Sequence, residues 1–147
     1  ISRSSPMIET LAGRVKLAMG QTADALGIYR AALRIYPQHR ALTYDYAEAL
    51  LRSDSVDAAL KFINQQLLFT PNDIRLYNLQ AQGYAALGRN LLQHRAQAEA
   101  YIRQGYLAAA IDQLQTALRS NDGDFYQVSS VEARLKELRE LAAANKN

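Results

Sequence analysis

The even spacing of helix-breaking residues along the chain is the feature that most constrains its fold. Glycine, proline or aspartate recurs every 17 residues, at Gly20, Pro37, Asp54, Pro71, Gly88, Gly105 and Asp122. The segments between these positions are rich in Ala and Leu, which favour helix, and no stretch alternates apolar and polar residues as a half-buried strand does. The sequence therefore predicts an all-α protein of about eight antiparallel helices joined by tight turns.

Two such helices make a 34-residue unit, and its residues resemble the tetratricopeptide repeat (TPR). That repeat places small residues where its two helices approach closely, a large residue between them, and proline after the second helix. Gly13, Ala25, Tyr29, Ala32 and Pro37 fit this pattern in the first unit. The resemblance implies a right-handed helical solenoid, with a further helix at about 125–143 capping its C-terminal end.

The pattern divides the chain, interpreted as a single domain over 1–147, into repeats at about 6–39 and 40–73, a half repeat at 74–89, and a repeat at 90–123. After Gly88 the sequence fits the repeat pattern only if the register is shifted by 17 residues, which is half of a repeat. Gln93 stands where the unshifted pattern expects alanine, whereas Ala98 fits the shifted pattern. The first helix of one repeat is thus followed directly by the first helix of the next. We therefore expect the stacking to be irregular near Gly88–Asn90.

The last helix is expected to close the stack with one apolar stripe formed by Val128, Val131, Leu135, Leu138 and Leu141. Its start is open to two interpretations. Ser129 and Glu132 have the spacing of a capping box, whereas Asp124 could cap an earlier turn.

The composition argues against several classes of function. Lys and Arg number 17 against 14 Asp and Glu, a net charge of +3, and these residues are dispersed rather than clustered, so no nucleic-acid partner is expected. No apolar run approaches the roughly 20 residues of a membrane span. The chain has no cysteine, its two histidines, His39 and His94, are far apart, and it lacks HExxH. We therefore expect no metal site, no cofactor and no catalysis in this chain.

The C-terminal half has a more specific resemblance. The segments Ala98–Leu107, Asp124–Gln127 and Val131–Leu138 are similar to the end of bacterial periplasmic zinc metallopeptidases, in which a TPR domain follows an HExxH protease domain. This resemblance implies a periplasmic docking domain whose partners are outer-membrane proteins or their assembly machinery. The zinc would then belong to a protease domain preceding Ile1, in keeping with our interpretation of the chain as processed or excised from a longer protein.

The TPR resemblance also implies a concave groove, lined by certain first-helix positions, that binds a protein or peptide. We expect Tyr44, Arg52, Arg75 and Arg95 to contribute most, because Tyr and Arg often anchor interfaces. The full set of candidates is Arg14, Tyr44, Glu48, Arg52, Arg75, Asn78, Gln82, Arg95, Glu99 and Arg103. Two alternatives remain open: a stand-alone TPR adaptor, which would be cytoplasmic or at the inner membrane, and an RNA-binding helical repeat.

Overall fold

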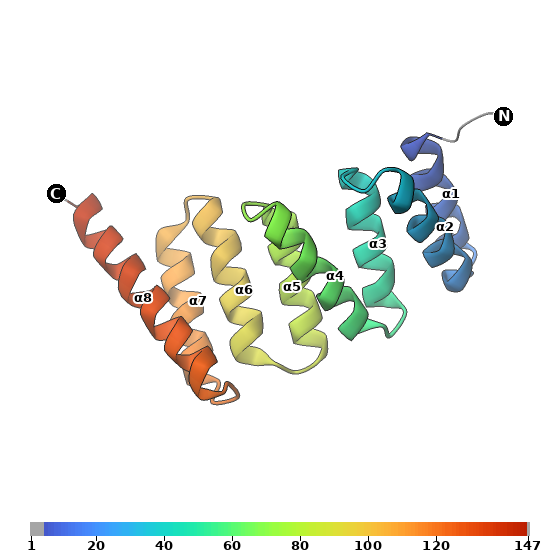
Figure 1. The fold of residues 1–147 in the computed structure, drawn as a ribbon. Coiled ribbons are helices and arrows are strands. Elements are labelled where there is room, and N and C mark those ends of the chain that lie inside the picture. Colours follow the sequence, from blue (N-terminus) through green and yellow to red (C-terminus); the bar gives the residue numbers. More distant parts are fainter. Residues whose placement is uncertain (1–4, 147) are drawn as a thin grey trace. The chain divides into compact units, whose positions relative to one another are not determined.

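The computed structural model describes residues 5–146, and every regular element in that range is an α-helix (Figure 1). The predicted all-α class is therefore confirmed. The helices are α1 (Pro6–Ala18), α2 (Thr22–Ile35), α3 (Arg40–Arg52), α4 (Val56–Phe69), α5 (Ile74–Ala86), α6 (Asn90–Arg103), α7 (Leu107–Arg119) and α8 (Phe125–Asn145).

The regularly spaced residues of the sequence lie in the turns between these helices. Gly20 and Gly88 have φ angles of 76° and 69°, a left-handed conformation that ends an α-helix and suits glycine. Asp54 takes up the same conformation after α3, with φ of 59°. Pro37 and Pro71 lie in the turns that precede α3 and α5. The 17-residue spacing is thus the spacing of helix ends.

The chain divides into two compact units, one ending at Phe62 and the other beginning at Ile63, so that α4 contributes to both. In the first unit, α1 packs against α2, and both of these helices contact α3. The ring of Tyr29 is fully buried against Gly13, where a Cβ atom would lie 2.2 Å from the tyrosine ring. Position 13 therefore has to be glycine for α1 and α2 to approach this closely.

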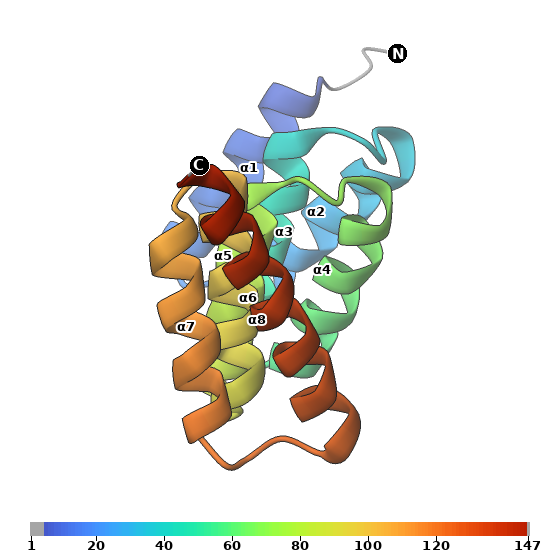
Figure 2. The same ribbon diagram turned by 90° about the vertical axis from the view of Figure 1, so that its left-hand side faces the viewer.

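In the second unit, α5 packs against α6, α6 against α7, and α8 against both α7 and α6 (Figure 2). Within the described part of this unit, α5 does not contact α7, although α1 contacts α3 in the first unit. The relation of α1, α2 and α3 is instead repeated by α6, α7 and α8. The start of a new repeat at Asn90, directly after the first helix of another repeat, stays a prediction.

Helix α8 closes this unit and starts at the earlier of the two predicted positions. Asp124 accepts the backbone N–H of Gln127 at 2.7 Å, and the Gln127 side chain accepts the backbone N–H of Asp124 at 3.1 Å. The capping box predicted at Ser129 and Glu132 is wrong, because this reciprocal pair starts the helix one turn earlier and leaves both residues inside it. Of the predicted stripe, Val131, Leu135 and Leu138 are buried against α6 and α7, and Val128 is partly buried against the same core. Leu141 is 50% exposed, so its predicted place in the buried stripe is wrong.

Candidate partner-binding site

A hollow on the surface of the α5–α6 pair gathers an unusual set of side chains. Its volume is 370 Å³, and it is lined by four carboxamides and two alanines: Asn78, Ala81, Gln82, Ala85, Gln93 and Gln97. None of these six residues carries a charge. Two of them, Asn78 and Gln82, are among the groove residues proposed from the sequence.

The helix geometry explains why the four carboxamides face one another. Asn78 and Gln82 are four residues apart on α5, and Gln93 and Gln97 are four apart on α6, so each pair lies on one face of its helix. The two helices are antiparallel neighbours, and the Gln97 amide nitrogen donates to the Asn78 side-chain oxygen at 3.4 Å. Gln82 and Gln93 are then brought opposite each other one turn further on.

The sequence analysis missed Gln93 and Gln97. In the repeat pattern, Gln93 stands out only as a departure from the small residue expected at that position. The available signal was the pair of carboxamides four residues apart on each of two consecutive helices. It became informative only once α5 and α6 were known to be antiparallel neighbours.

The candidates in the first unit lie around the buried Tyr29 hydroxyl. Arg14 of α1 donates to both carboxylate oxygens of Asp45 on α3, at 2.8 and 3.3 Å, while Asp45 itself is buried. Burial, together with the negative charges of Asp45 and Glu48, raises the pKa of Tyr29 to about 12, although Arg14 and Arg52 oppose this shift. Arg14 is therefore already engaged in joining α1 to α3.

Tyr44, Glu48 and Arg52 follow one another along α3 at helical spacing, and Arg52 is exposed. The Arg40 guanidinium lies 5.4 Å from the centre of the Tyr44 ring, a cation–π contact within the same helix. These residues form a polar surface of α3, and their contact with a partner stays a prediction.

Two further candidates, Glu99 and Arg103, belong to an ionic network that holds α8 against α6. Arg134 of α8 donates to both Glu99 oxygens, at 2.9 and 3.2 Å, and Arg103 donates to Glu99 from the next turn of α6. Arg103 also donates to the Pro71 carbonyl at 2.9 Å and lies 4.4 Å from the centre of the Tyr77 ring.

Burial alone would raise the pKa of Glu99, but the hydrogen bonds from Arg134 and Arg103 outweigh it and lower the pKa. Glu99 is therefore ionised at neutral pH and has a structural role here. Arg134 was not among the predicted residues, because no local pattern connects it to a residue 35 positions earlier.

The remaining candidates, Arg75 and Arg95, do not line the carboxamide hollow. Arg75 is exposed on α5, and Arg95 is half-buried on α6. That these two arginines contribute most to partner binding stays a prediction. The hollow is lined instead by neutral residues of the same two helices.

Each of the two histidines has a hydrogen-bonding partner within the protein. The Nδ1 atom of His39 accepts the Leu42 N–H at 3.4 Å and caps α3, and Nδ1 of His94 lies 2.8 Å from the Gln113 side-chain oxygen. Across residues 5–146, no group of three or more His, Cys, Asp or Glu side chains is placed to hold a metal ion.

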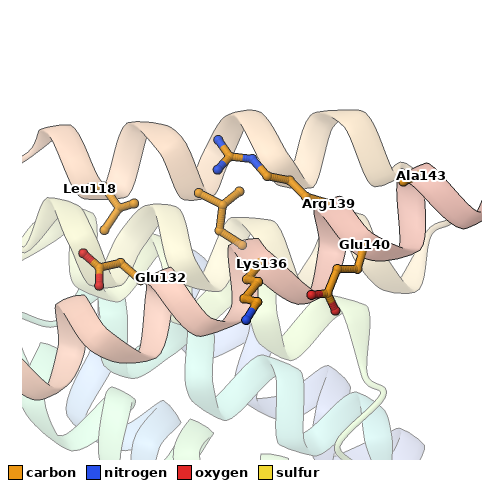
Figure 3. Close-up of a pocket in the computed structure, with 7 residues that line it drawn as sticks. Leu118, Glu132, Lys136, Arg139, Glu140 and Ala143 are labelled. Carbon is orange, nitrogen blue, oxygen red and sulfur yellow. The ribbon is translucent and has the colours of Figure 1, made fainter.

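A second hollow, of 420 Å³, lies between α7 and α8 (Figure 3). Leu118 and Leu135 supply its apolar part, while Glu132, Lys136, Arg139 and Glu140 of α8 surround it with both signs of charge. These charged residues have the spacing of a solvated outer face. Because none of the predicted groove residues lines it, the α5–α6 hollow is the stronger candidate site.

The architecture of the described helices is that of a helical-repeat protein of the TPR type. Residues 16–83 match the family model described as tetratricopeptide repeat. A crystal structure of a thermophilic TPR protein from Thermus thermophilus is similar, with a TM-score of 0.50 and 20% identity, covering 91% of this chain and 81% of that one. The predicted TPR fold is thus confirmed. Comparison with curated proteins gives no match, and none of the described helices is long and apolar enough to cross a membrane.

Proposed function

We propose that the chain is a protein-binding module that holds an extended peptide segment of its partner in the carboxamide hollow of α5 and α6. The observation that carries this proposal is the lining of the hollow by Asn78, Gln82, Gln93 and Gln97, without a charge. A carboxamide offers one acceptor oxygen and two N–H donors, and an extended peptide backbone presents the matching C=O and N–H groups. Such a site recognises a backbone in preference to a particular charged side chain.

The dimensions suit this type of ligand. A volume of 370 Å³ is within the range of about 300–1,000 Å³ that is usual for small ligand sites, and it fits a few residues of a peptide. Ala81 and Ala85 keep the space between the carboxamides open, because they are the smallest side chains that still favour a helix.

Site-specific photo-crosslinking tests the site. A photoreactive phenylalanine analogue at Gln93 is expected to capture the partner in cells of the source organism. The same analogue at Gln104, an exposed carboxamide outside the hollow, serves as the matched control. Equal capture at both positions, or capture at Gln104 alone, would contradict the assignment.

Once crosslinking has identified the partner, a pair of substitutions tests how much the hollow contributes to the binding affinity. Gln82→Ala with Gln93→Ala removes two of the four carboxamides without disfavouring helix, so the circular-dichroism signal should be retained. Binding is expected to weaken by about tenfold or more, since two hydrogen-bonding groups are lost. Gln104→Ala should leave the affinity unchanged.

For the parent protein, we propose the non-catalytic docking domain of a periplasmic zinc metallopeptidase that acts in outer-membrane protein quality control. Support comes from the similarity of Ala98–Leu107, Asp124–Gln127 and Val131–Leu138 to that family. The partner segments would then come from outer-membrane proteins or their assembly machinery. A TPR module suits this role because it contributes binding without requiring catalysis of its own.

The reading frame upstream of Ile1 tests this finer proposal. A leader peptide followed by HExxH and a third metal ligand is the expected result. An upstream region without that motif would leave a stand-alone TPR adaptor, and the crosslinking experiment on the hollow would remain valid in either case.

A further inference from the structure

Helix α6 carries polar side chains that reach both of its antiparallel neighbours. It packs against α5 and against α7, so it lies between them in the second unit (Figure 1). On one side, the Gln97 amide nitrogen donates to the Asn78 side-chain oxygen of α5 at 3.4 Å. On the other side, Nδ1 of His94 lies 2.8 Å from the Gln113 side-chain oxygen of α7. We call these four residues the polar row, because they cross three helices in succession.

The two hydrogen bonds of the polar row lie on the same surface of the unit. At about 100° per residue, Gln97 and His94 are only about 60° apart around α6. The short arc between them contains the exposed Asn90. The remaining arc contains the buried residues of the helix: Leu91, Leu92, Ala96, Ala98 and Ala100. The polar row is therefore continuous along one surface.

The polar row begins in the carboxamide hollow and continues beyond it. Asn78 and Gln97 line the hollow, whereas His94 and Gln113 lie outside it. His94 is three residues before Gln97 and is thus its neighbour on the helix surface. The row contains no Asp, Glu, Lys or Arg, so the uncharged character of the hollow extends over α6 to α7.

His94 and Gln113 offer a free acceptor beside a free donor. The Gln113 oxygen can only accept, so Nδ1 of His94 carries the hydrogen and Nε2 is left as an acceptor. Within residues 5–146, neither this Nε2 nor the Gln113 amide nitrogen has a hydrogen-bond partner. Both atoms reach solvent, because the Tyr29 hydroxyl alone is buried without a partner in that range. An extended backbone presents the matching N–H and C=O groups.

We propose that the partner segment crosses the helices from α5 to α7, with its backbone bound by His94 and Gln113 next to the part held in the hollow. This inference rests on the proposed function of the hollow. Neighbouring helix axes lie about 8–10 Å apart, so the path from α5 to α7 is about 16–20 Å. At about 3.3 Å per residue, an extended segment of about five or six residues covers it.

Photo-crosslinking with mapping of the linked residues tests this path. The photoreactive phenylalanine analogue is placed at Gln82 of α5 and, in a second variant, at Gln113 of α7. Both variants are expected to link to one segment of one partner, at sites about four to six residues apart. Ala108, an exposed residue of α7 about 140° around the helix from Gln113, is the matched control and should give no link to that segment.

A synthetic peptide with the mapped sequence then tests the contribution of α7. Gln113→Ala is expected to weaken its binding by about threefold to tenfold, since hydrogen bonds are lost while alanine favours the helix. Gln115→Ala removes a carboxamide from the opposite side of α7 and should leave the affinity unchanged. A peptide shortened by the residues linked to position 113 should bind wild type and Gln113→Ala equally.

The outcomes separate this inference from the proposed function. Capture at Gln82 and Gln93 without capture at Gln113 would overturn the crosswise path and leave the hollow as the binding site. Links to unrelated segments, equal capture at Gln113 and Ala108, or equal losses from Gln113→Ala and Gln115→Ala would do the same. No capture at Gln82, Gln93 or Gln113 would contradict both.

Discussion

The carboxylate of Asp122 accepts the backbone N–H of Leu91 at 2.8 Å, across 31 residues of sequence. It also accepts the N–H of Asn90, and the Ser120 hydroxyl donates to it at 3.0 Å. Arg89, the residue at the N-cap position of α6, makes no capping hydrogen bond with its side chain. The turn after α7 therefore supplies the cap of α6, and it joins the two helices at their ends.

Replacing Asp122 by alanine is expected to destabilise the protein. The first N–H groups of α6 would lose their acceptor, at a cost of about 1 kcal/mol in the free energy of unfolding. Urea unfolding followed by circular dichroism measures this cost. Asp112→Ala, at an exposed position within α7, is the matched control, and an equal loss in both variants would contradict the capping role.

The capping interaction should also weaken in acid. Burial alone would raise the pKa of Asp122, but the hydrogen bonds from Leu91 and Asn90 outweigh it and lower the pKa. A carboxylate with a depressed folded-state pKa stabilises the protein fully above its unfolded pKa, and this contribution is lost as the pH falls through the folded-state value. The stability difference between wild type and Asp122→Ala is therefore expected to shrink between pH 7 and about pH 3. A constant difference would argue against ionisation as its source.

The network around Glu99 predicts strong coupling between α6 and α8. Removing Glu99 leaves Arg134 without its bidentate partner, so Glu99→Gln should cost about 1–3 kcal/mol of stability. A double-mutant cycle with Arg134→Met isolates the pairwise part of this loss. Glu137, which also bonds Arg134 but is 63% exposed, is the control, and its replacement by alanine should change stability by less than about 1 kcal/mol. Equal losses of stability at Glu99 and Glu137 would show that the half-buried Glu99–Arg134 pair contributes no more than the exposed Glu137–Arg134 pair.

The contact between Gly13 and Tyr29 predicts opposite outcomes for two small changes. Gly13→Ala forces a methyl group against the Tyr29 ring and is expected to lower stability by about 1–3 kcal/mol, even though alanine favours helix. Tyr29→Phe should be neutral or slightly stabilising, because the buried Tyr29 hydroxyl has no hydrogen-bond partner. Thermal unfolding of both variants measures these effects. A tolerated Gly13→Ala would show that α1 and α2 can separate without loss.

The neutral lining of the α5–α6 hollow predicts a binding affinity that depends little on salt. Once the partner is captured, its dissociation constant is expected to change by less than about twofold between 50 and 500 mM salt. A steep loss of affinity with added salt would instead indicate that the partner binds at Tyr44, Arg52, Arg75 and Arg95, or that the ligand is RNA. Replacing those four residues by alanine together then distinguishes the charged groove from the carboxamide hollow.

The sequence by itself determined the helices and their ends. Gly20, Asp54 and Gly88 mark turns because their backbone conformation is local. The periodicity of α8 likewise located Val131, Leu135 and Leu138 in the core. Each of these inferences depends on residues within about one repeat of each other, a range over which helical geometry fixes the relation.

Only the tertiary structure decided which side chains meet across helices. Hydrogen bonds of 2.8–3.4 Å join Arg134 with Glu99 and Asn78 with Gln97 between two helices, and Asp122 with Leu91 between a turn and a helix. A sequence pattern gives the face on which a residue lies but not the rotation and axial offset of the helix packed against it. Those quantities follow from how Gly13, Tyr29 and the other core side chains fit together, and close packing of that kind is a property of the assembled helices.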